Sequence, residues 1–174
     1  MVIRPALPAD AQDLAILGER LWRDTYEGLI PSSDLEQYLV EAFGPDRQAA
    51  ELADPACRTL VLDEGGTLLG YAWLRAKGPA VEVPFERPLE VARFYVDRAL
   101  HGTGTAQSLM AALLAHAASA DHDGVWLQVW EQNPQAIRFY AKAGFRDVGD
   151  TVFLVGSLTY RDRLLVHRLM AQAD

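Results

Sequence analysis

The stretch from 91 to 118 most constrains the fold, because it reads as a short apolar strand, a glycine loop and a helix in direct succession. Gly102 and Gly104 leave backbone free of side chains where the helix begins. Unpaired amides and the helix dipole favour an anion at such an end, so the loop is either a phosphate site or a tight turn. Apolar residues at three- and four-residue steps predict the helix, namely Ala106, Leu109, Met110, Leu113, Leu114 and Ala117.

Two well-known nucleotide-binding loops do not fit this stretch. The dinucleotide fingerprint needs a third glycine where this chain has Gln107, and it needs an acidic strand end about 20 residues further on. A triphosphate loop needs Gly-Lys and then Ser or Thr, and no such run follows the turn. A phosphate bound here would therefore belong to another kind of ligand.

Length and charge narrow the class of protein. The chain has 174 residues, of which 50% are hydrophobic, so we expect a single domain over residues 1–174. A net charge of −8 argues against a nucleic-acid partner and favours a cationic small substrate. Cys57 is the only cysteine, which rules out an internal disulfide. Neither a membrane span nor a signal peptide is recognisable, so we expect a cytoplasmic protein without a membrane partner.

The segments before the central stretch predict a short strand, three helices and a hairpin. These elements cover residues 2–4, 10–26, 33–42, 45–54, and 59–63 paired with 68–74. The second helix is predicted from a capping box that begins at Ser33 and ends at Glu36. A surface loop with three prolines is expected over residues 76–89.

The segments after it predict a strand, a helix and two more strands. Residues 125–130 are apolar on both faces, which is typical of a strand inside a sheet. Asn133 precedes a proline and caps the next helix, which Gly144 ends. Strands are then expected near 145–155 and 163–169, joined by a turn through Gly156 to Asp162.

In its order of elements and in two motifs, the chain resembles the GCN5-related N-acetyltransferases, the GNAT superfamily. The first motif is His101-Gly102-Thr103-Gly104-Thr105-Ala106, in which His101 stands where the family has Gln or Arg. The second motif runs from Asn133 to Phe145 and contains Asn-Pro-Gln-Ala-Ile-Arg-Phe-Tyr. The run Val-Trp-Glu-Gln-Asn-Pro at 129–134 and the Thr25-Tyr26 pair are similar to the PaiA branch of polyamine acetyltransferases.

The resemblance implies an α/β (α+β) fold with a mixed, mostly antiparallel sheet of about seven strands and helices on both faces. A central parallel pair, 91–96 and 125–130, is expected to splay and to admit the pantetheine arm of acetyl-CoA. Amides of 102–106 would hold its pyrophosphate, and the amide of Val96 would polarise the thioester carbonyl. The implied cofactor-binding residues are Phe94, Tyr95, Val96, His101, Gly102, Thr103, Gly104, Thr105, Ala106, Asn133, Ala136 and Tyr140.

Two catalytic residues are also implied by the resemblance. Transfer to an amine needs a neutral nucleophile and a proton for the leaving thiolate. Tyr140 stands at the general-acid position, and Glu90 matches the general-base glutamate of related histone acetyltransferases. A core role for Tyr140, and an ion pair of Glu90 with Arg87 or Arg93, are the alternatives. The four histidines lack ligand spacing, so no metal is expected.

The implied activity is acetyl-CoA-dependent transfer of an acetyl group to a small amine, with a polyamine as a candidate, by direct attack in a ternary complex. The alternatives are a non-catalytic acyl-CoA-binding module and an acetyltransferase of a protein N-terminus or lysine. Trp126 and Trp130 share a strand face and belong either to the core or to the acceptor pocket. A monomer and a homodimer stay equally open. Four helix carboxylates are candidates for attracting a polycation, namely Glu19, Asp24, Glu27 and Asp34.

Overall fold

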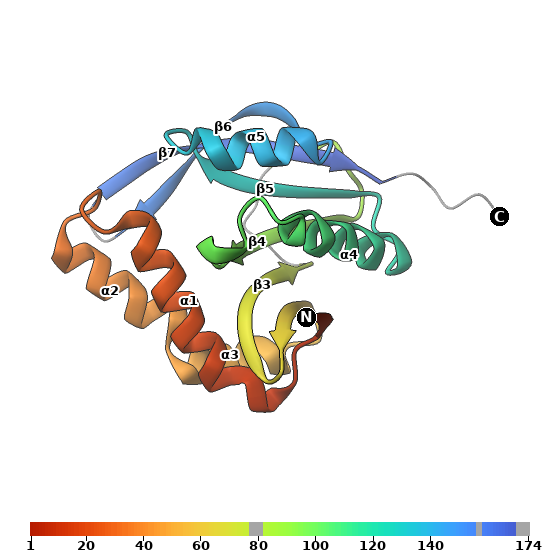
Figure 1. Cartoon of the computed structure of the whole chain (residues 1–174). Coiled ribbons are helices and arrows are strands. Elements are labelled where there is room, and N and C mark those ends of the chain that lie inside the picture. The colour runs from red at the N-terminus through yellow and green to blue at the C-terminus, as the bar shows by residue number, and fades with distance from the viewer. Residues whose placement is uncertain (77–81, 156–157, 170–174) are drawn as a thin grey trace.

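The computed structural model of the chain describes residues 1–76, 82–155 and 158–169. Its centre is one seven-stranded sheet with the strand order β1-β2-β3-β4-β5-β7-β6 (Figure 1). The strands are β1 (Val2–Pro5), β2 (Cys57–Glu64), β3 (Thr67–Arg75), β4 (Pro88–Val96), β5 (Gly124–Trp130), β6 (Arg146–Val155) and β7 (Leu158–Arg168). The mixed sheet confirms the expected fold class.

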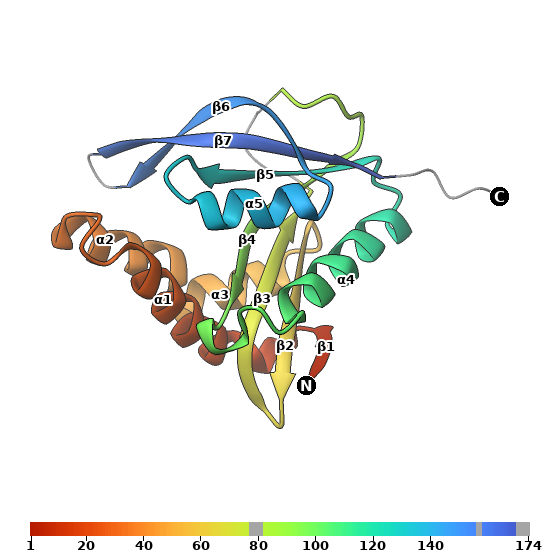
Figure 2. The same ribbon diagram turned by 45° about the horizontal axis from the view of Figure 1, so that its top comes forward.

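Helices cover both faces of this sheet (Figure 2). They are α1 (Ala11–Tyr26), α2 (Ser32–Phe43), α3 (Pro45–Ala53), α4 (Thr105–Ser119) and α5 (Pro134–Lys142). The α4 and α5 helices pack in one core cluster with the central strands, whereas α1 packs on the opposite face. We call these the α4–α5 face and the α1–α2 face. No helix in the described part of the chain is long and apolar enough to cross a membrane.

The alternation of side chains along the strands explains why both faces are apolar. Leu60 and Leu62 of β2 enter the core on the α4–α5 face, and Val61 between them enters the core on the α1–α2 face. In β3, Ala72 and Tyr71 divide between the two cores in the same way. The apolar runs in the sequence therefore fill two cores at once.

The β4 and β5 strands form a parallel pair that is joined at one end only. Their pairing covers Pro88 with Gly124, Leu89 with Val125, and Glu90 with Trp126. Beyond these pairs β4 stays hydrogen-bonded to β3 as far as Val96, and β5 stays bonded to β7. The two strands diverge visibly in Figure 2. We call the space between residues 91–96 and 127–130 the fork, and it confirms the expected splayed pair.

A bulge in β4 lies at the start of the fork. The register with β3 shifts between Trp73 and Leu74, so that Ala92 is an extra residue. As a result Ala92 and Arg93 both face the α1–α2 side, where Arg93 lies 4.4 Å from the centre of the Trp73 ring. A bulge redirects side chains in this way without ending the strand.

Local signals in the sequence placed most helix ends and turns correctly. Asn133 Oδ1 accepts a hydrogen bond from Ala136 N at 3.0 Å, which confirms the cap of α5. Gly144 has φ 87°, as expected after a helix end, and Gly65 and Gly66 turn the β2–β3 hairpin with φ 62° and 90°. The predicted cap at Ser33 was wrong: α2 already begins at Ser32, with Pro31 at the capping position and no side-chain cap.

Two predicted boundaries in the later chain were wrong. The turn expected from Gly156 to Asp162 is mostly strand, because β7 begins at Leu158 and pairs with Val155. Only residues 156–157 of that turn fall outside the described residues. The predicted loop 76–89 ends early, because β4 begins at Pro88, and its Pro79 lies outside the described residues.

Candidate active site

A cavity of about 1110 Å³ occupies the fork. On the α4–α5 face it is lined by Ala106, Ala136 and Tyr140, and on the α1–α2 face by residues such as Tyr26 and Asp162. Because one cavity reaches residues of both faces, the fork is an opening through the sheet. Two molecules can therefore approach each other from opposite sides.

The glycine loop before α4 has the geometry of an anion site. Gly102 and Gly104 have φ 79° and 89°, and a Cβ on either would meet no heavy atom within 4 Å. Gly104 occupies the capping position of α4 without a side-chain cap, and the amides of Ala106 and Gln107 have no acceptor among the described residues. These free donors and the open backbone fit a pyrophosphate.

His101 lines the cavity and contacts two neighbouring segments of the chain. Its Nε2 lies 3.0 Å from the carbonyl oxygen of Val96, and its Nδ1 lies 3.5 Å from Nε2 of Gln135. A carbonyl only accepts, so Nε2 carries the proton and Nδ1 is free to accept from the Gln135 amide. The imidazole thus links the end of β4 to the start of α5 beside the cavity. The carbonyl of Val96 therefore already has a donor.

The ring of Tyr140 packs in the core, and the residue also lines the cavity. Its ring packs against Phe94 and Phe145, with centroids 6.2 and 5.7 Å away, and the residue is 8% exposed. It also lines the cavity, and its hydroxyl has no hydrogen-bond partner in the described residues. Burial raises the pKa of Tyr140, which keeps the phenol protonated, as a proton donor must be.

Glu90 of β4 lies on the α1–α2 face of the sheet, and its side chain is buried, at 5% exposed. Its two carboxylate oxygens accept hydrogen bonds from Nε and Nη2 of Arg75 at 2.5 and 2.9 Å. An ion pair therefore exists, but its partner is Arg75 and not Arg87 or Arg93. Arg93 binds the carboxylate of Glu51 instead, at 2.6 and 3.1 Å. Glu90 still lines the cavity, within reach of a ligand on the α1–α2 face.

Aromatic rings and the carboxylate of Asp162 line part of the cavity on the α1–α2 face. The ring of Trp130 lies 5.8 Å from that of Tyr26 and 6.2 Å from that of Tyr160. Asp162 is 6% exposed and lines the cavity beside them. Burial, followed by the charge of Glu131, raises the pKa of Asp162 to about 6.

Asp162 is a site residue that the sequence reasoning missed, because the predicted turn contained it. The strand alternation of Tyr160, Asp162, Leu164 and Val166 on one face was the available signal. Trp126 belongs to the core with Leu164 and Val166, whereas Trp130 lines the cavity.

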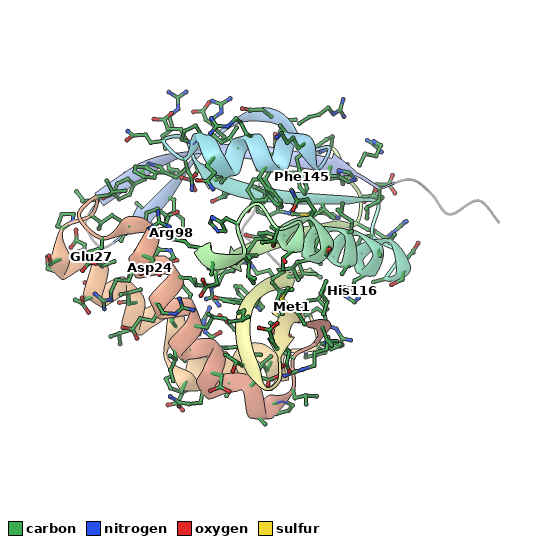
Figure 3. All side chains as sticks on the ribbon, viewed as in Figure 1. Met1, Asp24, Glu27, Arg98, His116 and Phe145 are labelled. Carbon is green, nitrogen blue, oxygen red and sulfur yellow. The ribbon has the colours of Figure 1, made fainter. Side chains whose placement is uncertain are left out.

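The cavity is less acidic than the overall charge suggested. Of the four helix carboxylates proposed to attract a cation, only Asp24 lines it. Figure 3 shows Asp24 on α1 and Arg98 beyond the end of β4, on the side where α1 approaches β4. Four carboxylates and four arginines line the cavity, namely Asp24, Glu41, Glu90 and Asp162 with Arg47, Arg75, Arg93 and Arg98. Any attraction of a cation must therefore come from individual carboxylates and not from the net charge of the cavity lining.

The histidines other than His101 have no evident part in the cavity. His116 lies on α4 (Figure 3), and His122 Nδ1 lies 3.0 Å from the carbonyl oxygen of Arg87. No group of three or more His, Cys, Asp or Glu side chains in the described ranges has the arrangement of a metal site.

Comparisons with known proteins agree with this geometry. Residues 19–145 match the Acetyltransferase (GNAT) family. An uncharacterized N-acetyltransferase of Mycobacterium bovis is 31% identical over 92% of this chain and 99% of its own length. The mycothiol acetyltransferase of Clavibacter sepedonicus is 34% identical over 79% of this chain and 40% of its own length. The N-alpha-acetyltransferase RimI of Mycobacterium tuberculosis is 35% identical over 67% of this chain and 72% of its own length.

Solved structures show the same fold. The PaiA N-acetyltransferase of Thermoplasma acidophilum, solved in complex with coenzyme A, superposes with a TM-score of 0.78 at 19% identity, over 96% of this chain and 98% of its own. A probable acetyltransferase of Staphylococcus epidermidis has the same TM-score at 13% identity, over 97% and 99% of the two chains. The chain belongs to the GNAT family and is an N-acetyltransferase.

Proposed function

We propose that the chain, as a single cytoplasmic domain, transfers the acetyl group of acetyl-CoA to a small amine by direct attack in a ternary complex. The observation that carries the proposal is the cavity that passes through the fork. It lets a donor on the α4–α5 face and an acceptor on the α1–α2 face meet without an acyl-enzyme. Cys57 does not line the cavity, and burial raises the pKa of its thiol, which disfavours a thiolate nucleophile.

The donor side fits a nucleotide thioester. Amides at the start of α4 would bind the pyrophosphate, and main-chain groups of Phe94, Tyr95 and Val96 would border the pantetheine arm. Ala136 lines the opposite wall, whereas the Asn133 side chain is used in capping α5. Acetyl-CoA would supply an activated acetyl group and a thiolate leaving group. The coenzyme A in the PaiA structure supports this choice of donor.

Two side chains would move the protons of the reaction. The amine attacks as a neutral nucleophile, and the protonated phenol of Tyr140 donates a proton to the leaving sulfur. Glu90 is the proposed acceptor of the amine proton. Each of its two oxygens already accepts one hydrogen bond from Arg75 and keeps a second lone pair that can accept the amine proton.

The nature of the acceptor distinguishes the remaining alternatives. A polyamine is favoured by the local sequence similarity to PaiA and by the buried carboxylate of Asp162 on the α1–α2 face, where the acceptor would bind. A protein N-terminus is the second candidate, because RimI is 35% identical over 67% of this chain. A non-catalytic module would have no use for a protonated phenol beside the fork.

A panel of amines tests the proposal. Acetyl-CoA is mixed with spermidine, butylamine, an amino acid or a peptide with a free N-terminus, and thiol release is followed. We expect release with at least one small amine, and strong loss of this release in Tyr140→Phe. Release with the peptide alone would identify protein N-termini as the acceptors instead. No release with any acceptor, although acetyl-CoA binds, would favour the non-catalytic module.

A further inference from the structure

Asp162 differs from every other buried carboxylate in the described residues. Four carboxylate side chains there are buried, and three of them have arginine partners. Asp10 pairs with Arg4, Glu51 with Arg93, and Glu90 with Arg75, all at 2.5–2.7 Å. Asp162 has neither an ion pair nor a side-chain hydrogen bond in the described structure. Burying a carboxylate without a partner is costly, so a partner from outside the chain is the simplest explanation.

The neighbouring cations do not turn toward it. Arg161 and Arg163 flank Asp162 in β7, but they pair with Asp150 and Asp147 of β6, at 3.1 and 2.8 Å. The charged group that affects the pKa of Asp162 is Glu131, and its negative charge raises that pKa further. Burial raises the pKa of the Tyr26 and Tyr38 phenols, and the negative charge of Asp162 adds to the rise in both. Among the described residues of these elements, none forms an ion pair with the Asp162 carboxylate.

Its surroundings match the chemistry of an organic cation. Tyr26, Tyr38, Trp130 and Tyr160 line the same cavity and contact one another in pairs or through Trp22, with ring centroids 4.3–6.2 Å apart. A carboxylate with aromatic faces around it is the usual receptor for an alkylammonium, because the ring faces carry negative charge and the carboxylate accepts its hydrogen bonds.

The position of Asp162 along the sheet separates it from the closed end of the fork. Asp162 pairs with Trp130, whereas the β4–β5 pairing ends at Trp126. Four residues of strand span about 13 Å. The carboxylate therefore lies toward the open end, away from Glu90, which marks the closed end.

We propose that Asp162 and the rings of Tyr26, Tyr38, Trp130 and Tyr160 form a subsite for a positively charged group of the acceptor other than the amine that is acetylated. The proposal rests on the proposed function in so far as an amine is the acceptor. It deepens that function by assigning the preference for a second charge to one residue. A diamine or a longer polyamine would place its remote ammonium against Asp162.

The test compares butylamine with 1,4-diaminobutane and spermidine, which carry additional ammonium groups. We expect the wild-type protein to have a higher kcat/KM for 1,4-diaminobutane and spermidine than for butylamine. Asp162→Asn should lose about 10-fold or more of that preference, mainly through a higher KM for the two polyamines. The kcat/KM for butylamine and the affinity for acetyl-CoA should stay within about twofold in the variant. Asp150→Asn is the matched control, because it removes an exposed carboxylate of the adjacent strand that does not line the cavity.

Binding separates this proposal from the proposed function. Calorimetry of spermidine with the coenzyme A complex reports the subsite even if no amine is acetylated. Binding to wild type that is lost in Asp162→Asn and kept in Asp150→Asn supports the subsite. Absent binding to wild type, unchanged binding in Asp162→Asn, or an equal fall in kcat/KM for butylamine and the polyamines overturns it.

Discussion

Gly102→Ala tests whether the loop before α4 holds the donor. Gly102 has φ 79° and lines the cavity, and a Cβ there would touch no heavy atom of the protein within 4 Å. The substitution should therefore leave the fold intact at a strain of about 1 kcal/mol. Gly66→Ala is the matched control, because Gly66 has φ 90°, equally open space and a place at the tip of the β2–β3 hairpin.

The expected effect on acetyl-CoA binding follows from one lost contact. A ligand at a hundredfold excess over its dissociation constant stabilises the native state by about 2.7 kcal/mol. In a chain of this size that raises the melting temperature by roughly 5–11 °C. If the new methyl group displaces one charge-assisted amide–phosphate bond, affinity falls about 100-fold. The stabilisation at the same ligand concentration then falls to about 0.4 kcal/mol, or roughly 1–2 °C.

The assay is thermal unfolding of wild type and both variants, with and without acetyl-CoA. Both variants should start from a similarly lowered melting temperature, and only Gly102→Ala should lose the response to the ligand. Equal responses of Gly102→Ala and Gly66→Ala would refute the assignment of the loop. NADH should have no effect on any of the three proteins.

Three further substitutions separate catalytic from structural roles. Tyr140→Phe keeps the ring packing and should lower kcat about 10²-fold or more with acetyl-CoA affinity unchanged, whereas full activity would leave Tyr140 a core residue only. Glu90→Gln should lower activity most at neutral pH, where the amine is mainly protonated, and the loss should diminish as pH rises; a loss that is independent of pH would mark Glu90 as the structural partner of Arg75. Asp162→Asn should change how the free energy of unfolding depends on pH. In wild type the pKa of Asp162 is about 6 in the folded state, above the ordinary 3.8, so its contribution to stability is fully present below pH 3.8 and is lost as pH rises through 6. The melting temperature of this variant relative to wild type should therefore climb between pH 4 and pH 7.5, and a constant difference would contradict a buried, unpaired carboxylate.

The features predicted correctly were those encoded in a few adjacent residues. The glycine loop before α4, the Asn133 cap and the β2–β3 hairpin each depend on local backbone geometry, which residue type largely decides. The fork itself came from the resemblance to a family, since no local pattern specifies where two parallel strands part.

The features that the sequence did not predict depend on contacts between distant segments. Arg75 meets Glu90 because β3 and β4 pair in a register with a bulge, and neither strand encodes that register alone. His101 meets the Val96 carbonyl only once the loop has folded back on β4. Asp162 looked like a turn residue because a polar side chain interrupts the apolar pattern, and a cavity is what permits that interruption.

A crystal structure of the protein with acetyl-CoA tests the central claim most directly. We predict the pyrophosphate within hydrogen-bond distance of amides in residues 102–107, and the thioester in the fork between residues 91–96 and 127–130. Tyr140 should lie on the same side as the sulfur, and Asp162 should remain open to the acceptor face. Acetyl-CoA bound outside the fork, or a fork closed by pairing of β4 with β5 along their full length, would contradict the account.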